Sequence, residues 1–196
     1  IFCQEKAHFY RGLSLFLQNI SKEEFEIEEK VNFHSNGMMM DCSRNGVMKT
    51  ETIERYAGIM AKMGYDTLML YTEETYEVDN EPFFGYMRGR YTKEELKRLD
   101  GILAGYGVEL VPCIQTLAHL KCMFRWDEYQ DIRDCDDILL IDEERTYQLL
   151  ERMFSTLRQC VSTTKIHVGM DEAHNVGLGK YLERHGYEDR FQLICR

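Results

Sequence analysis

The chain has 196 residues, of which 44% are apolar, and it contains 34 acidic and 24 basic residues, for a formal net charge of −10. This length supports one sizeable hydrophobic core and is short for two. The charge has the wrong sign for binding a phosphate backbone, so we expect no nucleic-acid partner. No apolar run approaches the roughly 20 residues that cross a bilayer, so we expect no membrane contact either.

The cysteines and the chain start bear on location. The seven cysteines form an odd set without a CxxC pair, which indicates neither a disulfide framework nor a zinc knuckle. We therefore expect reduced thiols and no cofactor. The first residues lack the pattern of a signal peptide, so we expect a cytoplasmic location. Because the chain begins with Ile1 rather than Met, we also expect it to be a segment of a longer protein.

The first 33 residues differ in pattern from the rest. An amphipathic helix is predicted over about 5–18, and the acidic stretch "EEFEIEEKVNF" that follows resembles a strand. We interpret 1–33 as the tail of a preceding domain or a connector. Residues 34–196 then form a separate unit.

Strands and helices alternate through that unit. Amphipathic helices are predicted over about 50–63, 92–107, 143–160 and 179–185, the second opening with a Thr-Lys-Glu-Glu capping box. In the third, the spacing predicts that Tyr147, Leu150, Phe154 and Leu157 share the buried stripe. Four short apolar runs are typical of parallel strands buried on both faces: 37–41, 66–71, 108–115 and 165–170.

This order predicts an α/β fold with a parallel sheet. The sheet is either open and doubly wound or part of a (β/α)8 TIM barrel. In both architectures chemistry takes place at the carboxyl ends of the strands, where this chain has its long polar loops. The functional residues are therefore expected there.

The stretch "KIHVGMDEAH" places two adjacent carboxylates, Asp171 and Glu172, after the fourth apolar run. The letters DEAH also occur in helicases, but no GxxxxGK[ST] phosphate-binding loop precedes them, so the helicase reading fails. Successive side chains on a strand point to opposite faces, so both carboxylates can face one pocket only where the strand breaks. Crowded carboxylates repel, which raises one pKa and leaves a proton to donate. The pair therefore suits acid–base chemistry.

The segment around these two carboxylates, together with three earlier segments, resembles glycoside hydrolase family 20, the β-N-acetylhexosaminidases. Residues 167–172, "HVGMDE", look like the family's His-x-Gly-Gly-Asp-Glu signature, with Met170 in place of the second Gly. Three further segments look like its first three barrel strands, in the right order: "MMMDCSRN" (38–45), "LMLYTEE" (68–74) and "VPCIQTLAH" (111–119). The third departs from the usual Pro-Glu-Ile-Asp-Thr-Pro-Gly-His pattern at Cys113, Gln115, Leu117 and Ala118.

The resemblance implies a fold and an activity. The fold is the TIM barrel, of which 34–196 would supply about the first four βα units. Residues 1–33 would be the end of the small α/β domain that precedes this barrel, or a connector. The activity is retaining removal of terminal β-linked N-acetylhexosamine, with the substrate's own acetamido oxygen as nucleophile. The implied partner is therefore an oligosaccharide or glycoconjugate that ends in N-acetylglucosamine or N-acetylgalactosamine.

The resemblance also implies roles for particular residues. Asp171 would orient and stabilise the acetamido group, and Glu172 would act as general acid and then as base. Arg44 would bind sugar hydroxyls. His119 is expected at the substrate, as is Glu73, which replaces a usual Asp. His167 would support the site.

Several alternatives remain open from the residues alone. Arg44 could pair with Asp41 and serve the fold. His167, Asp171, Glu172 and His174 could form a metal site for hydrolysis through bound water. The chain could also be a carbohydrate-binding half-barrel that is inactive alone, and a homo-oligomer could cover its last strand.

Overall fold

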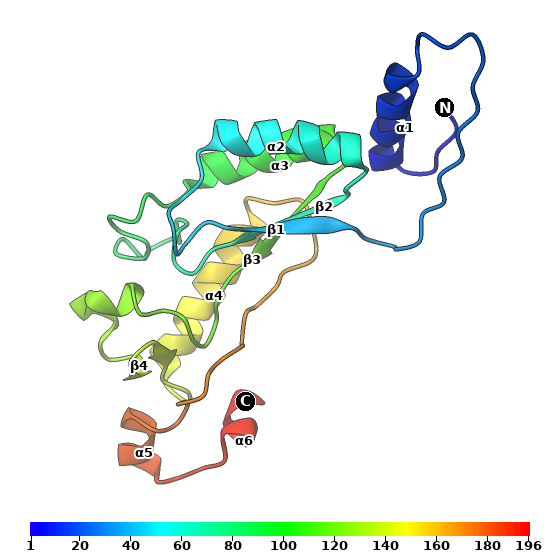
Figure 1. Ribbon diagram of the computed structural model, residues 1–196. Helices are drawn as coiled ribbons and strands as arrows, with labels where there is room; N and C mark the ends of the chain where they lie inside the picture. Colours follow the sequence, from blue (N-terminus) through cyan, green and yellow to red (C-terminus); the bar gives the residue numbers. More distant parts are fainter.

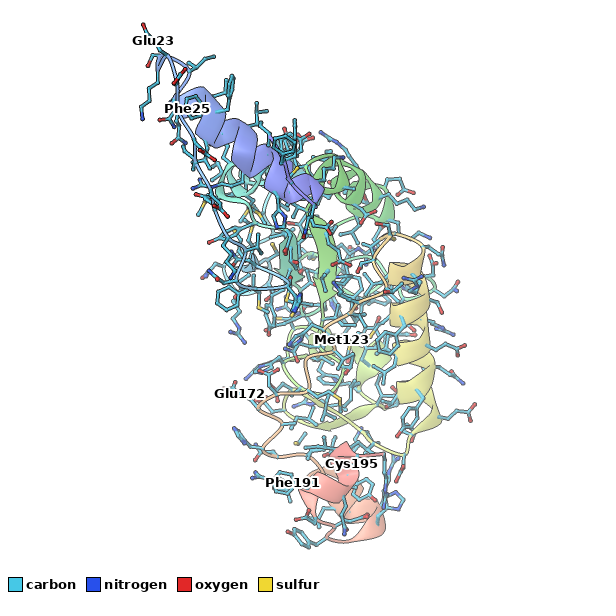
Figure 2. All side chains as sticks on the ribbon, turned by 90° about the vertical axis from the view of Figure 1, so that its right-hand side faces the viewer. Glu23, Phe25, Met123, Glu172, Phe191 and Cys195 are labelled. Carbon is cyan, nitrogen blue, oxygen red and sulfur yellow. The ribbon has the colours of Figure 1, made fainter.

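The computed structural model describes residues 1–196, with α1 at one end of the molecule and α5 and α6 at the other (Figures 1 and 2). No helix in it is both long and apolar enough to cross a membrane. In chain order, the elements are α1 (Lys6–Gln18), β1 (Gly37–Asp41), α2 (Thr50–Met63), β2 (Thr67–Tyr71), α3 (Lys93–Gly105), β3 (Glu109–Cys113), two short 3-10 helices (Met123–Arg125 and Asp127–Tyr129), β4 (Arg133–Cys135), β5 (Ile138–Leu139), α4 (Glu144–Arg158), α5 (Lys180–His185) and α6 (Arg190–Ile194).

The first three strands form one parallel sheet in the order β1-β2-β3. Each strand lies beside the next one in the chain, whereas a doubly wound sheet would reverse its order at a switch point. The α/β class and the parallel sheet are confirmed. Closure into an eight-stranded barrel remains a prediction.

The fourth predicted strand, 165–170, is reduced to a single bridge between His167 and Cys113. The His167 N–H donates to the Pro112 carbonyl, and the Ile114 N–H donates to the His167 carbonyl, both at 2.9 Å. Gly169 then takes a φ of +60°, which ends the extended conformation. The segment therefore lies beside β3 and parallel to it, but a strand over its whole length was wrongly predicted.

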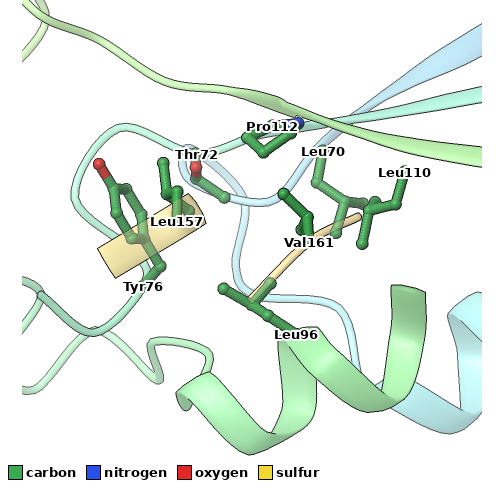
Figure 3. A pocket seen from close by; sticks show the side chains of 8 residues that line it. All are labelled: Leu70, Thr72, Tyr76, Leu96, Leu110, Pro112, Leu157 and Val161. Atoms are coloured by element: carbon green, nitrogen blue, oxygen red, sulfur yellow. The ribbon is translucent and has the colours of Figure 1, made fainter. Parts of the chain in front are cut away.

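One face of the sheet packs against helices. Side chains at alternate positions, among them Leu68, Leu70 and Leu110, join the main hydrophobic cluster with α2, α3 and α4. Leu99 and Leu103 of α3 are fully buried there, which stabilises the fold by about 2 kcal/mol each. A cavity of about 20 Å³ remains between the sheet, α3 and α4 (Figure 3). It is lined by Leu70, Thr72, Tyr76, Leu96, Leu110, Pro112, Leu157 and Val161.

The opposite face of the sheet is more open. Met39 in its middle row is 52% exposed. The row at the carboxyl ends consists of Asp41, Tyr71 and Cys113, which stand in register on the three neighbouring strands. This row brings polar groups together at the edge where the sequence predicted chemistry.

The segment before β1 is only partly as predicted. Helix α1 forms close to its expected bounds and contacts the carboxyl-terminal ends of α2 and α3, where the Tyr10 hydroxyl donates to the Gly105 carbonyl at 3.1 Å. The strand-like segment 23–33 is irregular and mostly exposed. Its alternating pattern finds no partner strand, so that expectation was wrong. The division at 33/34 stays a prediction.

A second, smaller hydrophobic cluster lies beyond the sheet, around Tyr181. The buried carboxylate of Asp134 in β4 accepts hydrogen bonds from the N–H groups of Gly177 and Tyr181, each at 2.8 Å. These bonds tie the segment after Glu172 to the β4–β5 ribbon. In Figure 2, Glu172 lies between the sheet and the α5–α6 end of the molecule.

Candidate active site

The turn after β1 presents Arg44. The Asp41 Oδ1 atom accepts hydrogen bonds from the N–H of Ser43 at 2.9 Å, the Ser43 hydroxyl at 3.0 Å and the N–H of Arg44 at 3.1 Å. Partial burial raises the pKa of Asp41, but these hydrogen bonds outweigh it and hold the pKa below its usual value. Asp41 therefore shapes the backbone of the turn.

The side chain of Arg44 contacts other groups. Its Nη2 donates to the Tyr71 hydroxyl at 3.2 Å, and its Nε lies 3.4 Å from Glu73 Oε1. The guanidinium carbon is 5.2 Å from the Tyr71 ring centroid, within range for a cation–π contact. The Arg44 side chain is still 54% exposed. It is anchored by Tyr71 and Glu73 in place of the alternative pair with Asp41, and it can reach a ligand.

Glu73 is the buried partner of Arg44, with a side chain only 10% exposed. Burial and the neighbouring charge of Glu74 raise its pKa. The structure places Glu73 behind Arg44, so its direct contact with substrate remains a prediction. Its visible contacts are with Arg44 and the Tyr71 hydroxyl.

The loop after β2 holds the Arg44 turn in place. Thr75 donates to the Cys42 carbonyl at 2.9 Å, and Arg88 donates to the Ser43 carbonyl at 2.6 Å. Arg88 is itself paired with the buried carboxylate of Glu74 at 2.6 Å. The ends of this loop meet, since the Tyr91 N–H donates to the Thr75 carbonyl. The two loops therefore form one connected frame.

Asp171 and Glu172 project into solvent from the segment beside β3, with side chains 63% and 66% exposed. The break that both carboxylates need occurs at Gly169 and at Glu172 itself, whose φ is +55°. Asp171 Oδ1 accepts a hydrogen bond from Gln115 Nε2 at 3.3 Å. Partial burial raises the pKa of Asp171, but the bond from Gln115 and nearby His119 outweigh this and lower it. Asp171 is therefore ionised near neutral pH.

His119 faces both carboxylates. Its Nε2 lies 3.4 Å from Glu172 Oε2 and 3.7 Å from Asp171 Oδ2. The residue has a φ of +59°, and its N–H donates to the Asp137 carboxylate at 3.2 Å. One ligand atom from each of His119, Asp171 and Glu172 lies within 4.8 Å of the others, so these three could also hold a cation.

The two histidines of the predicted metal set do not lie with the two carboxylates. His167 pairs with β3 through its backbone, and its side chain is exposed without a hydrogen bond. His174 is exposed as well. The metal set proposed from sequence does not converge, and His119 replaces both histidines in the cluster that does form.

Two site residues had no role in the sequence analysis, Tyr71 and Gln115. The Gln115 Nε2 atom donates to the Tyr71 hydroxyl at 3.0 Å as well as to Asp171. Strand parity could have found Tyr71, because it is the last strand residue on the same face as Asp41. Cys113 shares this row, but burial raises the pKa of its thiol to about 11, which leaves it a poor nucleophile.

The sequence matches no protein-family model and no curated protein sequence. Solved structures do match. A family 20 exo-β-N-acetylglucosaminidase from Vibrio harveyi superposes with a TM-score of 0.78 at 16% identity, over 95% of this chain and 37% of that chain. An N-acetyl-β-hexosaminidase from Streptomyces plicatus gives 0.65 at 22% identity, over 74% and 34% of the two chains.

This chain shares the fold of part of the family 20 glycoside hydrolase structures. A third match, the family 20 β-N-acetylhexosaminidase of Streptomyces coelicolor, agrees, with a TM-score of 0.67 at 21% identity over 81% of this chain and 37% of that one. The resemblance noted in the sequence is therefore confirmed at the level of the fold. The chain spans between about a third and two fifths of the length of these three neighbours.

Proposed function

We propose that the protein is a glycoside hydrolase that removes terminal β-linked N-acetylglucosamine or N-acetylgalactosamine with retention of configuration. The observation that carries this proposal is the position of Asp171 and Glu172, which stand side by side at the carboxyl end of the segment beside β3, facing His119. The shared fold supports it, since the Vibrio harveyi neighbour was crystallised with N-acetylglucosamine and one Streptomyces plicatus mutant with that sugar as product.

The proposed mechanism uses the acetamido oxygen of the substrate as nucleophile. Asp171, ionised and held by Gln115, accepts the acetamido N–H and stabilises the positive charge that develops on this group. Glu172 protonates the departing glycosidic oxygen and then removes a proton from the incoming water. His119 Nε2 lies 3.4 Å from Glu172 Oε2 and 3.7 Å from Asp171 Oδ2, where it can orient both carboxylates.

Arg44 supplies the recognition of the sugar ring. Its exposed guanidinium carries five N–H donors in a fixed plane, which suits two neighbouring hydroxyls. An arginine at this place favours a terminal sugar with free hydroxyls, so cleavage is proposed to be of the exo type.

The test is release of nitrophenol from nitrophenyl N-acetyl-β-glucosaminide and from the galactosaminide by the full protein that contains this chain. We expect Asp171→Asn and Glu172→Gln to lower kcat about 10²- to 10⁴-fold. Glu183→Gln, which removes an exposed α5 carboxylate without an ion pair, is the matched control and should leave kcat unchanged. A folded wild-type protein that releases nitrophenol from neither sugar would contradict the proposal.

Substrate assistance has its own readout. A trifluoroacetamido substrate has a less nucleophilic carbonyl oxygen, so it should react much more slowly than the acetamido substrate. Equal rates for the two would show that the acetamido group does not attack, even if hydrolysis itself is observed.

A second candidate function rests on the cluster of His119, Asp171 and Glu172, whose ligand atoms are close enough to share a cation. That arrangement would make the protein a metal-dependent hydrolase that activates water. Treatment with a chelator separates the two candidates. Turnover that a chelator abolishes and a divalent cation restores would favour the metal, whereas chelator-insensitive turnover supports the glycosidase mechanism proposed above.

A further inference from the structure

The hydroxyl of Tyr71 lies among three polar side chains of the candidate site. It accepts a hydrogen bond from Arg44 Nη2 at 3.2 Å and one from Gln115 Nε2 at 3.0 Å, and it donates to Glu73 Oε1 at 3.3 Å. The same Gln115 nitrogen donates to Asp171 at 3.3 Å. One hydroxyl on the central strand therefore connects the arginine to the aspartate.

The directions of these hydrogen bonds are fixed by chemistry. Arginine can only donate, so the Tyr71 oxygen must accept from Arg44. The Gln115 amide must turn its NH₂ group toward Asp171, because its carbonyl oxygen would repel that carboxylate. Tyr71 then has a single proton left for Glu73. Burial and the charge of Glu73 raise the pKa of Tyr71 to about 12, so this proton is present at neutral pH.

The Gln115 amide is held in this orientation at a cost. Its side chain is buried, and its Oε1 atom has no hydrogen-bond partner, which destabilises this arrangement. It also packs closely against Gly169, where a Cβ atom would lie 2.8 Å from Oε1. A side chain that served packing alone would not need a buried amide here, whereas both N–H bonds of Gln115 serve the site.

We propose that Tyr71 is a positioning residue that, through Gln115, sets the distance between Arg44 and Asp171. This inference rests on the proposed function, in which Arg44 binds the sugar hydroxyls and Asp171 binds the acetamido group. The two groups recognise different parts of one ring. Holding both to the same hydroxyl selects a sugar that carries free hydroxyls and an acetamido group at the spacing of a single pyranose.

The experiment measures kcat and KM for the N-acetyl-β-glucosaminide and its galacto epimer in Tyr71→Phe, Gln115→Met and the double variant of the full protein. Tyr106→Phe is the matched control, because this partly buried tyrosine lies after α3 and its hydroxyl makes no hydrogen bond. Thermal unfolding of each variant shows whether the protein remains folded.

We expect Gln115→Met to lower kcat about 10-fold or more with little change in KM, because it removes the link to Asp171 and leaves the hydrogen bond between Arg44 and Tyr71 in place. Tyr71→Phe should lower kcat similarly and also raise KM, because it releases Arg44 too. In the Gln115→Met background, Tyr71→Phe should change kcat less than about twofold while its effect on KM persists. Tyr106→Phe should leave both constants unchanged.

Other outcomes overturn the inference in distinguishable ways. An active wild-type protein whose Tyr71→Phe variant keeps both constants, or whose two substitutions multiply fully in kcat, rules out positioning through Gln115. A wild-type protein without turnover on either sugar overturns the proposed function first, and the positioning role with it. If Tyr71→Phe does not fold, Gln115→Met still decides, since an unchanged kcat there contradicts the proposal.

Discussion

Gly169 shows how one residue sets the direction of the two carboxylates. Its φ of +60° turns the chain away from β3 just before Asp171, and a Cβ atom there would lie 2.1 Å from the Ile114 carbonyl oxygen. Both the left-handed conformation and the missing side chain are therefore required. The backbone geometry of the segment therefore explains the Gly of the His-x-Gly motif.

We predict that Gly169→Ala lowers the free energy of unfolding by about 2 kcal/mol or more and lowers turnover, because the backbone must shift to relieve both conflicts. Gly101→Ala is the matched control. Gly101 lies inside α3, and an added Cβ atom there contacts nothing within 4 Å. Gly101→Ala should raise the free energy of unfolding by about 0.5–1 kcal/mol. Urea unfolding checks both values, and equal stability of the two variants would contradict the argument.

Sequence reasoning found the charged residues of the site and missed the neutral ones. Asp171 and Glu172 were singled out from their residue types and position and Arg44 from the family resemblance, and all three lie at one edge of the sheet. Tyr71 and Gln115 acquire a role only through strand register and through the break at Gly169. A tyrosine or a glutamine carries no such signal in the sequence alone, because both residue types also occur in ordinary hydrophobic cores.

At the scale of elements, the helix ends differ in how well they are capped. Helix α3 begins with a complete capping box, in which Thr92 and Glu95 satisfy each other's N–H groups. The N-cap residue of helix α2 is the exposed Lys49, whose side chain makes no capping bond. A capping side chain at position 49 should therefore stabilise α2, the helix that follows the Arg44 turn.

Two substitutions should accordingly change stability in opposite directions. We expect Thr92→Ala to lower the free energy of unfolding by about 1 kcal/mol and Lys49→Ser to raise it by about 0.5–1 kcal/mol. Thermal unfolding at one pH and salt concentration is sufficient to compare them. A gain from Thr92→Ala, or a loss from Lys49→Ser, would show that the caps contribute differently from what the structure implies.

The elements that were predicted wrongly depend on packing and pairing with distant parts of the chain, which a local sequence pattern does not show. The expected stripe on α4 included Tyr147, which is 42% exposed, whereas Leu149 and Met153 are fully buried. Neighbouring stripes on a helix differ by one residue, and only the packing against the sheet chooses between them. The strands expected at 23–33 and 165–170 failed for a related reason, since a strand needs a partner along its whole length.

At the scale of the whole molecule, one buried ion cluster joins the loop after β2 to α4. Both oxygens of Glu81 are paired, one with Arg145 and one with Arg152, each at 2.7 Å, and the Glu81 side chain is 1% exposed. Arg145 and Arg152 lie 64 and 71 residues after Glu81 in the sequence. This cluster therefore links the loop that frames the site to the body of the fold.

Removing its central carboxylate should be costly. We predict that Glu81→Gln lowers the free energy of unfolding by about 3 kcal/mol, because two partly buried guanidinium groups lose their counter-charge. Glu54→Gln breaks the exposed pair with Arg98 between α2 and α3 and should cost less than about 1 kcal/mol. Denaturant unfolding of both variants measures the difference, and similar small losses in both would mean that Glu81 is not important to the fold.

The joined ends of the loop after β2 also affect how this protein can change over evolutionary time. The bonds from Thr75 to Cys42 and from Arg88 to Ser43 hold the Arg44 turn, and the bond from the Tyr91 N–H to Thr75 joins the ends of the loop. Met87 at that tip is 79% exposed. Lengthening a loop whose ends already meet costs only about 0.6 kcal/mol for each doubling of its length. Insertions at this loop can therefore alter what binds beside the candidate site, while the geometry at the strand ends stays intact.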